Sequence, residues 1–158
     1  MSEPFESRLD ADALDIIELF SKHDVRFMVV GAYALAANGI SRATSDTDLW
    51  IDAEPANAPK VIAALTEFGA PLRAHGVTTA DFASPRSTYQ LGLPPRRIDF
   101  ITQLSGISFS EAWPQRIEVK IRNRDVAFLG YDALIKNKRA AARPKDLLDV
   151  EILERAKR

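Results

Sequence analysis

Apolar residues recur at helical spacing towards both ends of the chain. Around residues 10–22, acidic side chains lie opposite an apolar face formed by Leu9, Ala13, Ile16, Ile17 and Phe20. Similar patterns predict further helices over residues 31–39, 57–69, 131–142 and 144–158. Asn38-Gly39 and Gly69 are typical helix ends, and Pro144 suits the first turn of the last helix because a helix must break before it.

Short apolar runs and alternating patterns predict six strands. They cover residues 25–30, 46–51, 88–93, 96–102, 116–121 and 126–130, while residues 70–87 are expected to be irregular. The mixture of strands and helices, with helices gathered at both ends, predicts an α/β (α+β) fold. We expect a single domain over residues 1–158, with a core at 25–130 and a C-terminal helical segment at 131–158.

The composition is that of an ordinary globular chain, with 46% hydrophobic and 27% charged residues. No apolar run is long enough to cross a membrane, and the acidic N-terminus lacks the apolar segment of a signal peptide. The absence of cysteine excludes disulfides, thiolate metal sites and a cysteine nucleophile. We therefore expect a cytoplasmic protein without a membrane partner. Because the chain has only two histidines, any metal must be held by oxygen ligands.

The net charge of −1 conceals two halves of opposite sign. Residues 1–70 carry five Lys and Arg against twelve Asp and Glu, and residues 71–158 carry sixteen against ten. This asymmetry fits either a site where a cation meets a polyanion or simply solvated helix faces.

The stretch "SRATSDTDLWID", residues 41–52, combines acidic and apolar residues on one predicted strand. Because side chains alternate across a strand, Asp46 and Asp48 share one face with Trp50, while the apolar residues between them anchor the other face. Carboxylates two residues apart, roughly 7 Å at the backbone, can converge on one ion. Hard oxygen ligands of this type select Mg²⁺, Mn²⁺ or Ca²⁺.

A third acid, Asp99, stands inside the apolar strand "RRIDFIT". Aspartate is depleted in strand interiors and is costly there if buried without a partner. If this strand lies beside residues 46–51, Asp99 completes a triad of carboxylates. Three carboxylates around two hard cations are the equipment for phosphoryl or nucleotidyl transfer.

Each acidic feature also has a plain structural interpretation. A single Asp-x-Asp is common at a solvated strand edge, and Asp99 alone would fit an ion pair with Arg96 or Arg97. Asp52 is expected to start the turn after the strand. A structural Ca²⁺ site fits less well, because no Asp- and Asn-rich loop with a closing Glu is present.

Gly31 lies where an apolar strand ends and a helix begins. Backbone N–H groups at a helix N-terminus can receive a phosphate, and glycine lets the ligand approach the backbone closely. A strand–Gly–helix unit followed by an Asp-x-Asp strand is a far more specific pattern than either feature alone.

The stretch "VVGAYALAANGISRATSDTDLWI" resembles the signature of the nucleotidyltransferase superfamily with the polymerase-β-like fold. In that signature an apolar residue, Gly, and Gly or Ser are followed by a spacer and Asp-apolar-Asp-apolar. Here Gly31-Ala32 is followed by thirteen residues and then by Asp46 and Asp48. The third carboxylate of the family, on a later strand, matches Asp99.

The local form R-x-T-x-D-x-D and the C-terminal stretch "DALIKNKRAAARPKDLLDV" look most like the small prokaryotic branch that includes AbiEii-type toxin nucleotidyltransferases. The resemblance covers about residues 25–155. It implies a mixed central sheet with flanking helices.

The resemblance also implies a role for each matching residue. Asp46 and Asp48 would hold both metals, Mg²⁺ or alternatively Mn²⁺, and Asp99 would hold the catalytic one and help to deprotonate the acceptor hydroxyl. The nucleotide-binding residues would be Gly31, Ala32, Arg42, Thr44, Lys138 and Lys145. Ala32 replaces the second Gly or Ser of the family, so a hydroxyl contact to phosphate is missing, and Thr47 replaces an apolar residue.

Several residues keep two interpretations. Lys138 and Lys145 fit either phosphate binding or solvated helix positions. Trp50 fits stacking on a base or packing in the core, and His75 fits a substrate contact or a plain loop position.

Other charged residues of the last two helices are expected to be structural. Asp146 and Asp149 are expected to cap or pair within the last helix. Solvated positions are expected for Lys136, Arg139, Arg155 and Lys157.

The sequence therefore predicts a small Mg²⁺-dependent nucleotidyltransferase that attaches a nucleoside monophosphate from an NTP to a hydroxyl group. The expected acceptor is an RNA, such as a tRNA end, or a protein side chain, and the resemblance implies a cognate toxin or antitoxin partner. The alternative is a non-catalytic nucleotide-binding or antitoxin-type module of the same fold. The three intact carboxylates count against that alternative, and Ala32 counts weakly for it.

Overall fold

The structure, a computed structural model, describes residues 5–41 and 46–157. The strands are β1 Phe27–Val30, β2 Thr47–Ile51, β3 Thr88–Leu91, β4 Ile98–Ile101, β5 Ile117–Ile121 and β6 Arg124–Phe128. The α-helices are α1 Ala11–Lys22, α2 Gly31–Ala37, α3 Ala58–Phe68, α4 Thr79–Phe82, α5 Phe109–Ala112, α6 Tyr131–Ala141 and α7 Pro144–Lys157. Two 3₁₀ turns are η1 Phe5–Arg8 and η2 Trp113–Gln115.

The strands form one six-stranded mixed sheet in the order β3-β4-β2-β1-β6-β5. In its centre, β1 pairs antiparallel with β2 and parallel with β6, and β2 pairs parallel with β4. The outer pairs β3–β4 and β5–β6 are antiparallel. The two strands that carry the glycine and Asp-x-Asp motifs therefore lie in the middle of the sheet, held by neighbours on both sides.

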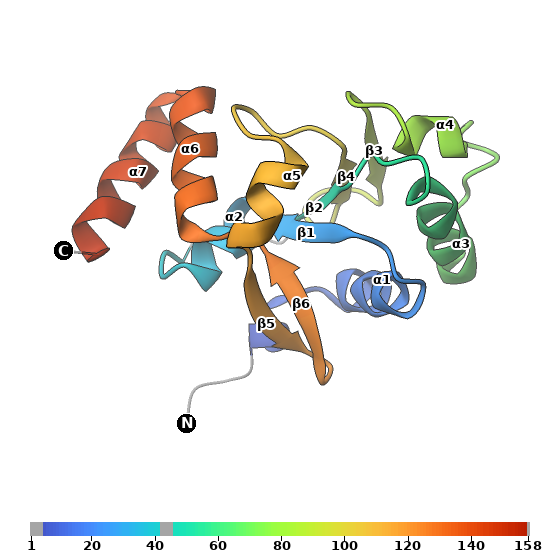
Figure 1. The fold of residues 1–158 in the computed structure, drawn as a ribbon. Helices are drawn as coiled ribbons and strands as arrows, with labels where there is room; N and C mark the ends of the chain where they lie inside the picture. The colour runs from blue at the N-terminus through green and yellow to red at the C-terminus, as the bar shows by residue number, and fades with distance from the viewer. Residues whose placement is uncertain (1–4, 42–45, 158) are drawn as a thin grey trace.

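Helices cover both faces of this sheet, and each face has its own apolar core. Because strand side chains alternate, β1 sends Phe27 and Val29 into a core shared with α1, α3 and α4. It sends Met28 and Val30 into a second core shared with α2, α5, α6 and α7. Figure 1 shows α6 and α7 at one end of the molecule and α3 and α4 at the other.

The apolar face predicted around the first helix is buried. Its residues Leu9, Ala13, Ile16, Ile17 and Phe20 all lie in the core. Asp10 caps the helix, since its side chain accepts a hydrogen bond from the Asp12 N–H at 3.1 Å. Burying each large side chain contributes about 1.5–3 kcal/mol, so this face fixes α1 against the sheet.

Two four-residue helices, α4 and α5, lie in segments for which the pattern predicted no helix. Residues 70–87 are therefore not wholly irregular as predicted. Four residues are too few to reveal a helical period. Each helix nevertheless begins with a capping box, formed by Thr78 with Asp81 and by Ser108 with Glu111. That signal was readable in the sequence.

The predicted break between the last two helices is confirmed. The chain leaves α6 at Ala142, which has a left-handed φ of 55°, and its N–H donates to the Lys138 carbonyl at 3.0 Å. Pro144 is the first residue of α7. Its missing N–H costs nothing there, because the first N–H groups of a helix have no intrahelical partner.

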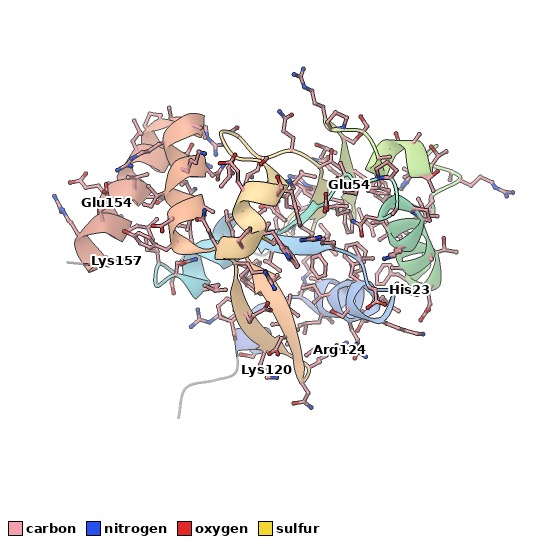
Figure 2. The ribbon with its side chains drawn as sticks, viewed as in Figure 1. His23, Glu54, Lys120, Arg124, Glu154 and Lys157 are labelled. Atoms are coloured by element: carbon pink, nitrogen blue, oxygen red, sulfur yellow. The ribbon has the colours of Figure 1, made fainter. Side chains whose placement is uncertain are left out.

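Charged side chains cover the outside of the molecule. Figure 2 labels examples at Glu54, Lys120, Arg124, Glu154 and Lys157. Arg139 pairs with Glu154 at 3.0 Å, and Lys157 lies 4.0 Å from the centre of the Tyr131 ring. These cations of the last helices hold surface positions, as expected. Among the described helices, none combines the length and apolar character that a membrane crossing requires.

Candidate active site

Asp48 and Asp99 lie side by side on neighbouring strands. β2 and β4 run parallel in a register that pairs Asp48 with Asp99 and Trp50 with Ile101. Paired residues of adjacent strands project towards the same face of the sheet, so the two carboxyl groups share one side. The strand adjacency on which the predicted triad depends is therefore present.

Arg97 joins two of the three predicted carboxylates. Its backbone N–H donates to Asp46 Oδ1 at 3.0 Å. Its guanidinium donates to both oxygens of Asp99, from Nε to Oδ1 at 2.7 Å and from Nη2 to Oδ2 at 3.2 Å. The ion pair that the sequence allowed as an alternative explanation of Asp99 thus exists alongside the carboxylate cluster.

The surroundings of Asp48 disfavour its ionised form. Burial, followed by the charges of Asp99 and Asp46, raises the pKa of Asp48 to about 6, although Arg97 acts in the opposite direction. Carboxylates this close cannot all ionise cheaply unless a cation lies between them. A divalent cation bound to the cluster would relieve this repulsion.

Gly31 makes room for Asp48. It adopts a left-handed φ of 69°, and a Cβ on this residue would lie 2.2 Å from Asp48 Oδ2. Any other residue would be strained at this φ and would force Asp48 to shift, so the backbone at the β1–α2 junction lies directly against the carboxylate. Gly31 and Ala32 are the first two residues of α2, where N–H groups lack intrahelical partners.

A cavity of about 290 Å³ connects this junction to the C-terminal helices. Gly31 and Asp48 line it from the sheet side, and Lys138 and Arg143 line it from the helical segment. Lys138, predicted as one possible phosphate contact, therefore shares a cavity with the glycine and one carboxylate.

Lys138 is held by a buried ion cluster between α6 and α7. Its Nζ lies 3.1 Å from both Asp146 Oδ1 and Asp149 Oδ2. Arg143 adds two hydrogen bonds to Asp146, at 2.6 and 3.2 Å. Burial would raise the pKa of Asp146, but the bonds from Arg143 and Lys138 outweigh it and hold that pKa below its usual value.

The expectation that Asp146 and Asp149 cap or pair within the last helix is confirmed for the cap and misses their partner on α6. Asp146 does cap the start of α7, accepting the Arg143 N–H at 3.3 Å. Both aspartates, however, pair with Lys138 of α6. The reason is tertiary: α6 packs on α7, and this places the lysine over two acids that share one helix face.

The carboxylates suit a hard divalent ion chemically, but their side chains do not stand as a formed metal site. Asp46, Asp48 and Asp99 offer only oxygen ligands, which Mg²⁺ and Mn²⁺ prefer. Yet among the residues that the structure describes, no group of three or more His, Asp or Glu side chains is placed to hold a metal. Arg97 instead donates hydrogen bonds to both oxygens of Asp99.

Of the predicted nucleotide contacts that the structure describes, Gly31 and Lys138 line this cavity, whereas Ala32 and Lys145 are not in its lining. Arg42 and Thr44 lie outside the described residues. Lys145 is the second residue of α7 and is exposed. Its role as a phosphate or acceptor contact stays a prediction.

Trp50 and His75 have structural contacts. Trp50 is 1% exposed and packs edge-on against Phe109, with ring centroids 5.2 Å apart, which confirms the core-packing interpretation. His75 Nδ1 lies 2.8 Å from the Tyr89 hydroxyl, away from the carboxylates. Asp52 takes its expected place in the turn after β2.

Sequence reasoning does not single out Arg143, and it treats Arg97 only as a competing partner of Asp99. For Arg97 a signal was present, because a residue two positions before Asp99 on a strand shares its face. No spacing rule indicates that Arg143, just before Pro144, reaches the cavity of Gly31.

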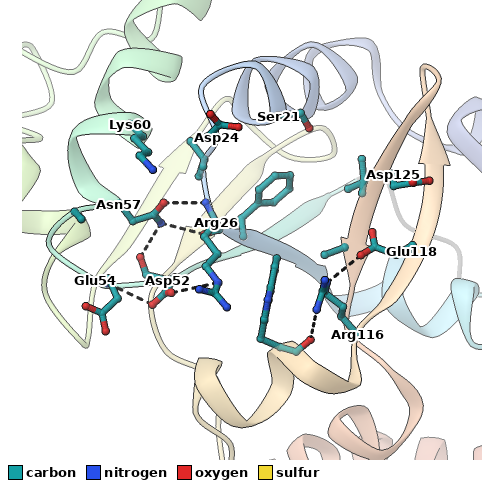
Figure 3. A pocket seen from close by; sticks show the side chains of 16 residues that line it. Ser21, Asp24, Arg26, Asp52, Glu54, Asn57, Lys60, Arg116, Glu118 and Asp125 are labelled. Atoms are coloured by element: carbon teal, nitrogen blue, oxygen red, sulfur yellow. Dashed lines mark hydrogen bonds and ion pairs between the residues drawn. The ribbon is translucent and has the colours of Figure 1, made fainter.

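A second, larger cavity of about 880 Å³ lies at the opposite end of β1 and β2 (Figure 3). Arg26 and Arg116 both lie over the Trp113 ring, 4.5 and 4.1 Å from its centroid. Arg26 faces Asp52 at 3.8 Å, and Arg116 pairs with Glu118 at 2.9 Å. The lining of this larger cavity has more acids than cations, and Arg26 and Arg116 are already engaged by Asp52 and Glu118. The smaller cavity is the candidate site, because it brings Asp48 and Gly31 together with Lys138.

No protein-family model matches the sequence, and no curated protein matches it. Among solved structures, the chain is similar to the lincosamide antibiotic adenylyltransferase LnuA, solved with lincomycin bound. The TM-score is 0.52 and the identity 14%, over 92% of this chain and 97% of that chain. An antigenic nucleotidyltransferase-like protein from Paracoccidioides brasiliensis aligns over 92% of this chain and 77% of that one, with 16% identity and a TM-score of 0.47. The similarity to LnuA shows a shared fold, so the predicted nucleotidyltransferase-type α/β fold is confirmed.

Proposed function

We propose that this chain is a divalent-metal-dependent nucleotidyltransferase, which transfers a nucleoside monophosphate from an NTP such as ATP to a hydroxyl group. The observation that carries the proposal is the pairing of Asp48 with Asp99 directly against Gly31. The cavity at this point also contains Lys138, a cation suited to phosphate. The fold shared with LnuA supports the same reaction class.

The residues around the cavity suit separate parts of the reaction. The acceptor oxygen forms a bond to the α-phosphorus while the bond from that phosphorus to pyrophosphate breaks. In the proposal Asp99 accepts the hydroxyl proton, and the N–H groups of Gly31 and Ala32 hold triphosphate oxygens. Lys138 offsets the charge of the leaving pyrophosphate.

Arg42 and Thr44 would add contacts to the same triphosphate. Lys145, on the surface of α7, would contact either the triphosphate or a nucleic-acid acceptor. These three assignments rest on the sequence resemblance.

Mg²⁺, or Mn²⁺ in its place, is the proposed cofactor, with Asp46, Asp48 and Asp99 as ligands. Bound there, it would neutralise phosphate charge and make the acceptor hydroxyl easier to deprotonate. Because the pKa of Asp48 is raised to about 6, a proton competes with the metal for this carboxylate at lower pH.

The proposed acceptor is an RNA, such as a tRNA end, or the side chain of a protein. The choice of acceptor is based on the sequence resemblance to AbiEii-type toxin nucleotidyltransferases. On the same basis, we propose a cognate toxin or antitoxin partner. A hydroxyl of a small molecule is a second acceptor class. It is favoured by the match to LnuA, whose fold this chain covers over 97% of its length.

The alternative function is a non-catalytic nucleotide-binding or antitoxin-type module of the same fold. One observation favours it: Arg97 holds Asp99 with two hydrogen bonds, and among the described residues no group of three acidic or histidine side chains is placed to hold a metal. This alternative predicts that the affinity for NTP is the same with and without divalent ions.

The decisive experiment incubates the protein with each α-labelled NTP and Mg²⁺, in the presence of total RNA, cell lysate or lincomycin. We expect label transfer that is lost in Asp48→Asn and in Asp99→Asn. Asp52→Asn is the matched control, because Asp52 stands at the far end of the same strand, beside Arg26. Transfer that survives in Asp48→Asn and Asp99→Asn would remove these residues from the mechanism. Growth arrest on expression of the chain alone would indicate a toxin.

A further inference from the structure

The third carboxylate of the proposed site already has a cation, supplied by the protein itself. The Arg97 guanidinium meets both oxygens of Asp99, at 2.7 and 3.2 Å. The two side chains are 30% and 15% exposed, so water screens the pair only partly. Two parallel N–H···O bonds between Arg and a carboxylate form the strong, geometrically specific type of ion pair.

The backbone of Arg97 is tied into the same cluster. Its N–H donates to Asp46 Oδ1 at 3.0 Å, and its C=O accepts the N–H of Thr47 at 3.0 Å. Arg97 thus bridges the start of β2 and the start of β4. Its main chain is held by Asp46 and Thr47, while its guanidinium makes its hydrogen bonds to Asp99.

Arg97 also offsets the repulsion among the acids. Its guanidinium is hydrogen-bonded to Asp99 at 2.7 Å and its backbone N–H to Asp46 at 3.0 Å, so a positive charge lies among the acids. Arginine stays charged at any working pH. The carboxylate cluster therefore contains its own counter-ion.

We propose that Arg97 is a positioning residue that holds Asp99 in the metal-free protein, and that Asp99 becomes a metal ligand only when the guanidinium turns away. This deepens the proposed nucleotidyltransferase function and rests on it. The guanidinium takes one lone pair on each oxygen of Asp99 and lies where a divalent ion would chelate both oxygens, so Arg97 competes with the metal for this position.

The competition has a consequence for substrate binding. An NTP brings phosphate oxygens, which offer the guanidinium another bidentate partner. Metal and NTP should therefore bind cooperatively, because each favours the state in which Arg97 has left Asp99. Metal alone should bind weakly, which keeps the site from assembling without its substrate.

The test measures Mn²⁺ binding by titration calorimetry, without NTP and with a non-hydrolysable NTP analogue. We expect Arg97→Gln to bind Mn²⁺ about ten-fold more tightly than the wild type in the absence of nucleotide, and to lose most of the cooperativity. Arg97→Lys should fall between, because an ammonium is a point charge and cannot engage both oxygens at once.

Arg96→Gln is the matched control. Arg96 is the neighbouring residue, its side chain is 75% exposed, and its ion pair is with Asp10 at 3.7 Å. We expect its Mn²⁺ affinity to equal that of the wild type. Thermal denaturation of each variant, with and without Mn²⁺, checks folding. For Arg97→Gln the metal should raise the melting temperature more than it does for the wild type.

If Arg97 has only a structural role, Arg97→Gln and Arg97→Lys should bind Mn²⁺ as tightly as the wild type or more weakly. Both variants should also keep the wild-type cooperativity between Mn²⁺ and nucleotide. That outcome overturns the inference but leaves the proposed function intact, provided that Asp99→Asn still abolishes metal binding. If no variant and not even the wild type binds Mn²⁺ with or without nucleotide, the proposed function and the inference fail together. If Arg97→Gln does not fold, the inference is tested by the Mn²⁺ affinity of Arg97→Lys and by whether Mn²⁺ and nucleotide bind cooperatively to the wild type.

Discussion

Asp48 on β2 stands directly opposite Asp99 on the parallel strand β4. The two residues come from distant segments, and their pairing concentrates negative charge beside Gly31. Next to burial, this pairing is the main cause of the raised pKa of Asp48, and the proposed affinity for a divalent ion depends on it.

Replacing Asp48 with Asn should stabilise the metal-free protein at neutral pH. Burial, Asp99 and Asp46 raise the pKa of Asp48 from 3.8 to about 6. A raised pKa means that the folded state favours the protonated acid, so this contribution to stability is complete below about pH 4 and is lost as the pH rises through about 6. We expect Asp48→Asn to raise the free energy of unfolding by about 2–3 kcal/mol at about pH 7.5, measured by urea denaturation.

The pH dependence is the diagnostic part of this prediction. Near pH 4 the wild type and Asp48→Asn should be about equally stable. Asp52→Asn, at the other end of β2, should show no gain that grows with pH. A stabilisation by Asp48→Asn that is the same at both pH values would mean that charge repulsion is not its cause.

The affinity for Mn²⁺ should increase between about pH 5 and pH 7, measured by calorimetry. The metal requires ionised Asp48, and the proton leaves this group only as the pH passes about 6. In Asp48→Asn the affinity should be low and nearly independent of pH over this range. An affinity that is already maximal at pH 5 would show that Asp48 is ionised there or is not a ligand.

Gly31→Ala should destabilise the protein by more than the strain of placing alanine at the positive φ of residue 31. Its Cβ would lie 2.2 Å from Asp48 Oδ2. Gly39→Ala is a matched control, because Gly39 also has a positive φ, 104°, but nothing within 4 Å of an added Cβ. We expect Gly39→Ala to cost about 1–2 kcal/mol of stability, which is the backbone term alone.

Urea denaturation and label transfer together test the comparison. Gly31→Ala should lose clearly more stability than Gly39→Ala and should also lose transfer activity, because Asp48 must move. Equal stability costs and unchanged transfer in both variants would show that Asp48 does not need this space.

Lys138→Ala should destabilise the protein by about 3–5 kcal/mol, because it leaves two buried aspartates without their shared cation. The side chains of Asp146 and Asp149 are 0% and 4% exposed, and Lys138 is 11% exposed. Lys136→Ala is the control on the same helix, since its ion pair with Glu111 is half exposed and should be worth less than about 1 kcal/mol.

The functional part of this prediction concerns nucleotide binding. At a temperature where the variant remains folded, Lys138→Ala should raise the KM for NTP, because a phosphate contact is lost from the cavity. Lys136→Ala should leave that KM unchanged. A KM unaffected by Lys138→Ala would make Lys138 a purely structural link between α6 and α7.

Much of the architecture was predictable because its signals are local. The apolar face of α1, the alternation in β2 and the break before Pro144 each depend on spacing within a few residues. The misses have the same origin. α4 and α5 are too short to show a period. The cap that Asp146 forms was predicted, but the pairing of Asp146 and Asp149 with Lys138 of α6 was not, because the sequence shows only neighbours.

By itself, the sequence determined which residues carry the candidate chemistry: Asp46, Asp48, Asp99 and Gly31. Residue type and strand alternation are properties of single elements, and they place each side chain on a face. Only the tertiary structure decided that β4 lies parallel to β2, and that Lys138 reaches the cavity from α6. It also decided that the guanidinium of Arg97 pairs with the carboxylate of Asp99. Strand register and ion pairing are set by packing and charge among distant segments, which no local pattern encodes.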